Sequence, residues 1–132
     1  RRTSLTFTRR SVNQLLREAT QAAPVAAANQ YDVVYCAGLT DYLVDPVCRR
    51  LVGLLHSWVA PGGLLIITNV DSSNPRIHTM EYVLEWHLIY RSAAQLAALA
   101  PPSAQPDDVK VTSDVTGVNN YLEIRKPQEA GA

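Results

Sequence analysis

Side chains that can carry chemistry lie in two short segments of this sequence. Asp41 and Tyr42 follow a buried-looking apolar run, and His78, Glu81 and His87 lie in a second segment that is rich in aromatic residues. Carboxylate and imidazole groups can accept a proton from a bound molecule, so either segment could supply a general base. The second segment lacks the supporting residues of a metal site, and we expect no bound metal.

The second segment, residues 80–90, has the spacing of a helix with two different faces. Glu81 and Glu85 are four residues apart and would share one face of that helix. A second face would be aromatic and apolar, formed by Tyr82, Trp86 and either Ile89 or Tyr90. A stripe of this kind is more often part of a core than of a pocket, and both interpretations are kept.

Alternating strands and helices must position these residues. Two continuous apolar runs, 31–37 and 64–68, are typical of parallel strands that are covered on both faces. Between them we expect a helix that Asp45 caps, with Pro46 in its first turn, and that stops at Pro61-Gly62-Gly63. Upstream, residues 5–8 have the composition of a strand, and a helix from Ser11 to about Ala28 follows, interrupted near Pro24.

The downstream part of the chain predicts one more helix and a hairpin. Ser92 and Gln95 form a capping box for a short helix that ends before Pro101. Residues 109–113 and 121–126 predict two antiparallel strands joined by a turn. In an open α/β sheet, ligands bind beyond the carboxyl ends of the parallel strands, which places the loops 36–42 and 69–73 at the expected site.

Three of these segments together resemble class I S-adenosylmethionine (SAM)-dependent methyltransferases. Residues 31–38 (YDVVYCAG) are similar to the fourth strand of that family and the loop behind it. Residues 58–67 (WVAPGGLLII) resemble its Pro-Gly-Gly turn into the fifth strand, and the closing strands resemble its terminal hairpin. Residues 38–43 and 80–91 also resemble a bacterial subgroup that includes enzymes proposed to methylate a hydroxy-fatty acid to its ester.

The resemblance implies a fold, a cofactor and a set of site residues. The fold is a partial Rossmann-like α/β sheet, mostly parallel with a terminal antiparallel hairpin, and the cofactor is SAM. The implied cofactor-binding residues are Ser11, Val12, Cys36, Ala37, Gly38 and Leu39. The implied catalytic residues are Asp41, Tyr42, Glu81 and His87. The implied acceptor-binding residues are Asn69, Tyr82, Trp86 and Tyr90.

Three of these residues also have a purely structural interpretation. Ser11 could serve only as a helix cap, Gly38 only as a turn glycine, and Asp41 only as a cap for the helix that follows it.

One departure from the family pattern changes what the chain can do alone. The glycine-rich loop of the family (D/E-x-G-x-G-x-G) and its first two strands are absent from these residues, since the six glycines are scattered. We therefore expect residues 1–127 to be the carboxyl-terminal portion of a methyltransferase domain that is inactive alone, followed by a disordered tail at 128–132. The strand 31–37 would then have an open apolar edge, which soluble proteins avoid. A missing amino-terminal segment, the strand at 5–8 or a second copy could cover that edge.

Composition narrows the class of partner. Lys plus Arg and Asp plus Glu both number 12, so the formal net charge is zero. Such a chain has no field to attract nucleic acid, and it contains no apolar run of the roughly 20 residues that span a bilayer. The partner we expect is therefore a small-molecule acceptor. Cys36 and Cys48 lack the spacing of a metal site, and two free thiols indicate a cytoplasmic protein.

Three interpretations of the function follow. The first is a methyltransferase that acts on a small-molecule or fatty-acid-like acceptor. The second is a non-catalytic, truncated α/β module that serves assembly or regulation, which the missing glycine-rich loop favours. Half of a nucleotide-dependent oxidoreductase fits less well, because such halves seldom end in this hairpin.

Overall fold

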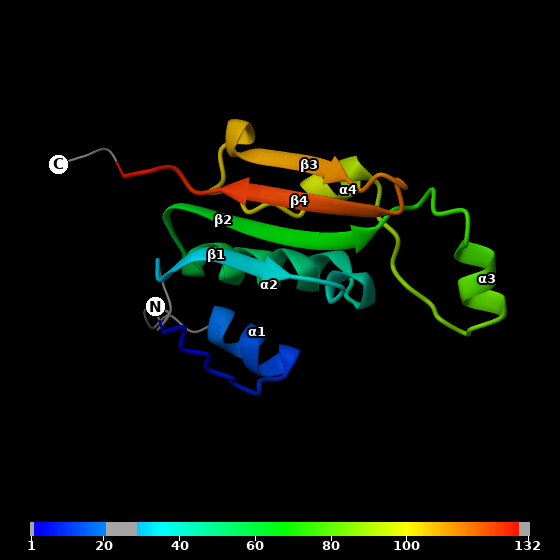
Figure 1. Ribbon diagram of the computed structural model, residues 1–132, viewed down its shortest axis with the longest axis horizontal. Coiled ribbons are helices and arrows are strands. Elements are labelled where there is room, and N and C mark those ends of the chain that lie inside the picture. Colours follow the sequence, from blue (N-terminus) through cyan, green and yellow to red (C-terminus); the bar gives the residue numbers. More distant parts are fainter. Residues whose placement is uncertain (1, 21–28, 130–132) are drawn as a thin grey trace.

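The structure, a computed structural model, describes residues 2–20 and 29–129. Helices pack on one face of a four-stranded sheet (Figure 1). The elements in chain order are α1 (Val12–Thr20), β1 (Tyr31–Cys36), the 3₁₀ turn η1 (Thr40–Tyr42), α2 (Asp45–Trp58), β2 (Val59–Val70), α3 (Ile77–Tyr82), α4 (Ala93–Ala97), the 3₁₀ turn η2 (Pro106–Asp108), β3 (Val109–Ser113) and β4 (Asn119–Arg125).

The strand order is β1-β2-β4-β3. β1 pairs in parallel with β2, and the helix α2 connects the two strands. β4 is antiparallel to both β2 and β3. This arrangement confirms the predicted α/β sheet with a terminal hairpin. The sheet was expected to be mostly parallel, but the described residues contain one parallel pair of strands and two antiparallel pairs. A parallel sheet would need further strands beside β1.

The predicted strand at residues 5–8 does not form. The segment is irregular, and Leu5 and Phe7 are 76% and 87% exposed. A strand is stable only when a neighbour pairs with it or a layer covers its apolar face, and this segment has neither here. Its composition was therefore not enough to make it a strand.

The helix α1 begins as predicted. Ser11 Oγ accepts the Gln14 N–H at 3.2 Å, and Gln14 Oε1 accepts the Ser11 N–H at 2.7 Å, which completes the capping box. The helix contacts α2. Its expected continuation to Ala28 and the interruption at Pro24 lie outside the described residues, as does most of the predicted tail at 128–132.

The helix α2 and the strand β2 follow each other without a loop. The helix ends at Trp58, earlier than predicted, and the strand starts at Val59. Tyr31 of β1 lies beside Val59, while Val33 lies beside Leu64, so the Pro-Gly-Gly sequence forms a bulge inside β2 and does not precede it.

Gly63 explains why that bulge requires glycine. A Cβ atom at this position would lie 2.7 Å from the Asp32 carbonyl oxygen and 2.8 Å from the Ala60 carbonyl oxygen. The two strands therefore approach each other too closely here for any side chain.

The predicted cap of α2 is wrong. The N-cap residue is Val44, and Asp45 is the first helical residue, with no side-chain capping hydrogen bond. The Asp45 carboxylate instead accepts hydrogen bonds from Arg91. An acidic side chain in the first turn still interacts favourably with the helix dipole.

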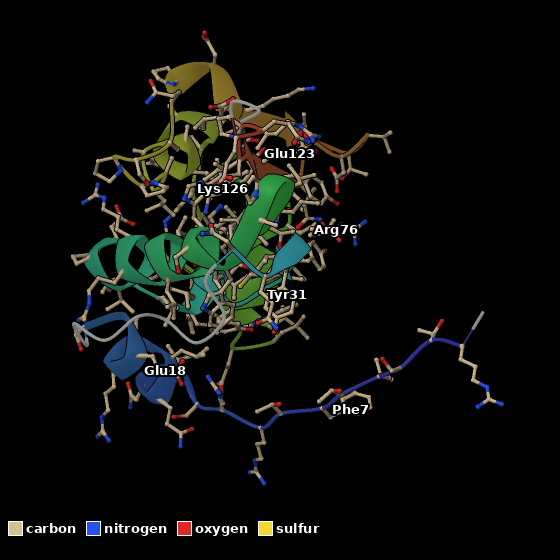
Figure 2. The ribbon with its side chains drawn as sticks, turned by 90° about the vertical axis from the view of Figure 1, so that its left-hand side faces the viewer. Phe7, Glu18, Tyr31, Arg76, Glu123 and Lys126 are labelled. Carbon is tan, nitrogen blue, oxygen red and sulfur yellow. The ribbon has the colours of Figure 1, made fainter. Side chains whose placement is uncertain are left out.

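The prediction that β1 is covered on both faces is also wrong. Val34 is buried against the helical layer, whereas Tyr31, Val33 and Tyr35 are exposed on the opposite face. Figure 2 shows Tyr31 on the side of the sheet away from α2. No element of the described chain lies over that part of the sheet.

The long helix predicted at residues 80–90 ends early. α3 stops at Tyr82, Glu85 adopts a left-handed φ of 49°, and the Trp86 N–H donates to the Met80 carbonyl at 2.8 Å. A left-handed residue just past the helix, with a hydrogen bond back to its last turn, thus ends α3. Glu81 and Glu85 therefore do not share a helical face, and Tyr82, Trp86 and Tyr90 do not form a helical stripe. Hydrogen bonds of Ile89 and Arg91 to the loop after β1 and to the end of β2 hold the residues after Trp86 outside any helix.

The downstream predictions are confirmed. Ser92 and Gln95 form both hydrogen bonds of a capping box at the start of α4, and β3 and β4 form the hairpin. α2 and α4 cover the same face of the sheet (Figures 1 and 2). The core between them and the sheet consists of Val34, Cys48, Leu51, Val52, Leu55, Val59, Leu65, Ile67, Leu96, Leu99, Leu122 and Ile124. In the part of the chain that the structure describes, no helix is long and apolar enough to cross a membrane.

Candidate functional site

The loop after β1 is fixed to the end of β2. The Gly38 N–H donates to Thr68 Oγ1 at 3.0 Å, and Thr40 Oγ1 donates to the Thr68 carbonyl at 2.8 Å. Gly38 has a φ of 71°, and no atom lies within 4 Å of where its Cβ would be. The carboxyl ends of the two parallel strands therefore meet at one edge of the sheet, with open space beside a glycine.

Asp41 is buried at this edge. One of its carboxylate oxygens accepts the Val70 N–H at 2.8 Å, and its carbonyl accepts the Ile89 N–H at 2.6 Å. Burial raises the pKa of the carboxyl above its usual value, against the opposing effects of the Val70 N–H and the Arg91 charge. Asp41 thus joins three segments. The alternative interpretation, that it only caps α2, is wrong.

A buried arginine that the sequence did not single out organises the site. Arg91 is 2% exposed and donates to the carbonyls of Thr40 at 2.7 Å and of Leu43 at 2.6 Å. Its guanidinium also donates to Asn69 Oδ1 at 2.7 Å and pairs with the Asp45 carboxylate at 2.8 Å. The planar fork suits several acceptors at once, so this one side chain holds the loop 40–45 against β2.

Asn69 is enclosed by the same network. Its amide nitrogen donates to the carbonyls of Ile89 at 2.9 Å and Val70 at 3.1 Å. Its oxygen accepts from Arg91 and shares the single Thr40 hydroxyl proton with the Thr68 carbonyl. The side chain is fully buried and its polar atoms are used within the protein. In this structure Asn69 joins the two loops.

Asp71 extends the network to the hairpin. Its carboxylate accepts hydrogen bonds from Ser73 and from the Asn120 amide, which also donates to the Arg91 carbonyl at 3.2 Å. The Ser73 hydrogen bonds lower the pKa of Asp71 most, followed by that of Asn120. This acid was also missed, although its place directly after a buried strand could have indicated it.

Aromatic side chains lie on the outer side of the network. The Trp86 indole N–H donates to the Tyr42 hydroxyl at 2.8 Å, which ties the segment after α3 to the loop after β1. The Tyr90 hydroxyl is buried without a hydrogen-bond partner among the described residues. Burial raises the pKa of Tyr90 most, and the negative charges of Glu81 and Asp41 raise it further.

Two of the predicted residues lie apart from this group. Tyr82 is exposed and stacks on His78, with ring centroids 6.1 Å apart. His87 is exposed and makes no hydrogen bond or ion pair with the network in the described part of the chain. α3 itself projects beyond the carboxyl ends of β1 and β2 (Figure 1).

Comparisons with known proteins test the fold. No protein-family model matches the chain, and no curated protein sequence matches it. Among solved structures, an O-methyltransferase family protein of Burkholderia thailandensis matches with a TM-score of 0.60 and 17% identity, over 94% of this chain and 36% of that one. Human N-acetylserotonin methyltransferase in complex with SAM matches with a TM-score of 0.58 and 13% identity, over 84% of this chain and 32% of that one.

The chain has part of the class I SAM-dependent methyltransferase fold. A Bordetella parapertussis protein, described as a possible exported protein, matches with a TM-score of 0.64 and 19% identity, over 76% of this chain and 40% of that one. The chain therefore spans 32–40% of the length of these three structures. At these identities the likeness concerns the fold alone.

Within the methyltransferase fold, the residues predicted on the cofactor side divide into two places. Cys36 is the last residue of β1, and Ala37, Gly38 and Leu39 form the loop after it. Burial, more than the nearby Cys48 and Asp41, raises the pKa of the Cys36 thiol to about 11, so that the thiol is neutral. Ser11 and Val12 lie at the start of α1, where the Ser11 N–H and hydroxyl are both used by the capping box.

One hollow in the described part of the chain lies away from the candidate site. A groove of about 480 Å³ between α2 and the turn after α4 contains none of the predicted site residues; it is lined by Arg49, Arg50, Gly53, Leu54, Ser57 and residues 98–102. In the described ranges, no group of three or more His, Cys, Asp or Glu side chains could hold a metal ion.

Proposed function

We propose that these residues form the acceptor side of a SAM-dependent methyltransferase that acts on a small-molecule or fatty-acid-like acceptor. The observation that carries the proposal is the junction of the β1 and β2 loops. Arg91 and Asn69 fix the two loops to each other, and a buried carboxylate and an aromatic segment lie at their edge. In α/β folds of this kind, that edge is where ligands bind.

The loop after β1 fits the cofactor in two respects. Gly38 leaves open space and an accessible backbone, which a side chain would fill. The neutral Cys36 thiol places no negative charge where it could react with a sulfonium. SAM, when bound, supplies the electrophilic methyl group. The residues of this chain would then hold its methionine part along 36–39 and, at α1, its adenine near Ser11 and Val12.

The acceptor side would use Asp41 and the aromatic residues. Methyl transfer depends mainly on orienting the two reactants, with removal of a proton where the acceptor needs it. A carboxyl whose pKa is raised by burial is a better base than an exposed one, so Asp41 suits a hydroxyl acceptor, with Glu81 and His87 as the other candidates. A carboxylate acceptor needs no base. For either kind of acceptor, the apolar part would contact the aromatic side chains of Tyr42, Tyr82, Trp86 and Tyr90.

The proposal assigns the remaining half of the cofactor site to residues outside this sequence. None of its glycines forms the glycine-rich loop of the family. The 132 residues alone are therefore expected to be inactive, and the activity belongs to a larger methyltransferase. Two free thiols, Cys36 and Cys48, are consistent with a cytoplasmic enzyme.

A second candidate is a non-catalytic module that serves assembly or regulation. The saturation of Asn69 by protein groups favours it, because a fully used polar residue at the strand ends is a structural feature. The two candidates differ in one measurable property, which is whether the loop after β1 can contribute to SAM binding.

Calorimetric titration of S-adenosylhomocysteine separates them. One sample is the 132-residue chain, and the other is a chimera in which the amino-terminal half of the Burkholderia thailandensis protein precedes it. We expect no binding by the chain alone and micromolar binding by the chimera. A chimera that is folded by circular dichroism but does not bind would rule out the methyltransferase proposal in favour of the module.

A matched pair of variants assigns the binding to this chain. Gly38→Val in the chimera should abolish binding, because the side chain fills the open space and opposes the positive φ. Gly117→Val, at a hairpin glycine with a similar φ of 69° and equally open surroundings, should bind as the parent does. Equal binding by both variants would show that residues 36–39 do not hold the cofactor.

A further inference from the structure

A groove on the helical side of the fold contains none of the residues proposed for methyl transfer. It has a volume of about 480 Å³ and lies between α2 and the turn after α4, and its size suits a small organic ligand. Because α2 packs on β1 and β2 while α4 packs on β3 and β4, the groove lies over the middle of the sheet (Figure 1). Further strands of a larger protein would join at the outer side of β1, which is away from this groove.

Gly53 leaves open space in one wall of the groove. It lies inside the 14-residue helix α2, where glycine lowers the stability of a helix relative to alanine. No neighbouring atom requires this glycine, because nothing lies within 4 Å of the position that its Cβ would occupy. The packing of the described residues therefore does not explain Gly53, whereas room for a bound molecule does.

The opposite wall of the groove is apolar and consists mostly of small side chains. Residues 98–102 have the sequence Ala-Leu-Ala-Pro-Pro, and the two prolines carry no backbone N–H. Leu99 of this wall and Leu54 of α2 are buried, and the Ser57 hydroxyl donates to the Leu54 carbonyl at 2.5 Å. Water in the groove therefore finds few hydrogen-bond donors on these walls, so an apolar ligand would displace it favourably.

Two arginines without an acidic partner line the same groove. Arg49 and Arg50 are exposed, none of the lining residues is acidic, and neither guanidinium forms an ion pair within the described residues. Asp45, one turn before Arg49 on α2, pairs with Arg91 instead. The hydrogen bond from Arg50 Nη2 to the Leu16 carbonyl is long, at 3.4 Å. Most donors of both guanidinium groups are therefore free, and their planar shape suits a carboxylate.

We propose that this groove binds a small organic anion that consists of an apolar body and a carboxylate. The carboxylate lies at Arg49 and Arg50, and the apolar body fills the space beside Gly53, against residues 98–102. The part of α2 that lines the groove, from Arg49 to Ser57, is about 12 Å long, which limits the ligand to a small molecule. The inference is independent of the proposed methyltransferase function, because the groove shares no residue with the junction of the β1 and β2 loops.

Titration of the 132-residue chain with 4-phenylbutyrate, followed by calorimetry and by NMR of the backbone amides, tests the site. We expect saturable binding with a dissociation constant below about 1 mM, and shifts of the Gly53 and Ala100 signals but not of the Gly117 signal. 4-Phenylbutyramide has the same shape without the charge, so it should bind about tenfold more weakly or worse. Absent binding, equal binding of the acid and the amide, or shifts confined to residues 36–42 would overturn the proposal.

Two variants separate binding in the groove from folding and from net charge. Gly53→Met fills the open space with a good helix former, so binding of phenylbutyrate should weaken about tenfold or more while the melting temperature does not fall. The double variant Arg49→Gln/Arg50→Gln should weaken binding to a similar extent. Arg2→Gln/Arg9→Gln makes the same change of charge at exposed arginines outside the groove and should bind as the parent does. Binding by Gly53→Met that equals that of the parent, or equal effects of the two double variants, would show that the anion does not bind here.

Discussion

Replacing Arg91 tests whether this side chain organises the site through backbone carbonyls or through its ion pair. The variant Arg91→Met keeps much of the volume and removes every hydrogen bond that the guanidinium donates. Those bonds reach the Thr40 and Leu43 carbonyls, Asn69 Oδ1 and the Asp45 carboxylate. Because these acceptors differ in their exposure to water, losing the hydrogen bond to each of them lowers the free energy of unfolding by a different amount.

The structure allows these costs to be compared. The Asp45 side chain is 51% exposed, so its carboxylate can return to water and the pair contributes little. The other three acceptors, which are the Thr40 and Leu43 carbonyls and Asn69 Oδ1, are less accessible to water. Each keeps one weaker donor when the guanidinium is removed. The loss of each hydrogen bond should therefore cost only about 1 kcal/mol. We therefore expect Arg91→Met to lower the free energy of unfolding by about 3 kcal/mol, against a usual total of about 5–15 kcal/mol.

Urea denaturation followed by circular dichroism measures this difference. Asp45→Asn is the matched control, because it removes the charge of the ion pair and leaves the carbonyl contacts intact. It should cost less than about 1 kcal/mol. If Asp45→Asn destabilised the protein as much as Arg91→Met, the ion pair would dominate and the reasoning would be wrong. Arg91→Lys should fall between them, since an ammonium cannot reproduce the planar fork.

Three further predictions concern other parts of the fold. Gly63→Ala should lower the unfolding free energy by about 1–3 kcal/mol in urea denaturation, because its Cβ meets backbone oxygens of β1 and β2, whereas Gly53→Ala, in open space on α2, should raise it by about 0.5–1 kcal/mol. Burial, aided by the charge of Lys126, lowers the pKa of His56 below 6.5, so the unfolded chain binds a proton more readily than the folded one. The free energy of unfolding should therefore fall as the pH drops below about 6.5. In thermal melts, His56→Gln should remove this dependence of stability on pH. Hydrogen bonds from Thr116 and Asn119 lower the pKa of Asp114 to about 2, so its carboxyl carbon should titrate there by NMR, and an unchanged midpoint in Thr116→Val would refute the assignment.

The sequence predicted the elements whose signals are local. Both capping boxes, at Ser11 and Ser92, were read from residues three apart, and both form. The helix before the Pro-Gly-Gly bulge and the closing hairpin also agree, because turn and cap residues specify them within a few positions. These elements required no knowledge of the rest of the chain.

The failures lie where distant residues decide the structure. Residues 5–8 needed a neighbouring strand, and residues 83–90 lost their helix to hydrogen bonds from Ile89 to Asp41 and from Asn69 to Ile89. In the site, the position of Asp41 after a buried strand was informative. Arg91 was missed because a single arginine usually lies on the surface, although its place between an apolar run and a helix cap was a usable signal.

The position of β4 inside the sheet has a consequence for the order of folding. β4 follows β3 in the chain but lies between β2 and β3, with its partners in β2 about 50–60 residues upstream. During synthesis, β1 and β2 emerge first and leave the inner edge of β2 bare until the hairpin arrives. Contacts this distant in sequence slow folding, so the hairpin should dock as a late unit. A chain shortened before residue 119 would therefore lose the interior of the sheet, and β3 would have no strand to join.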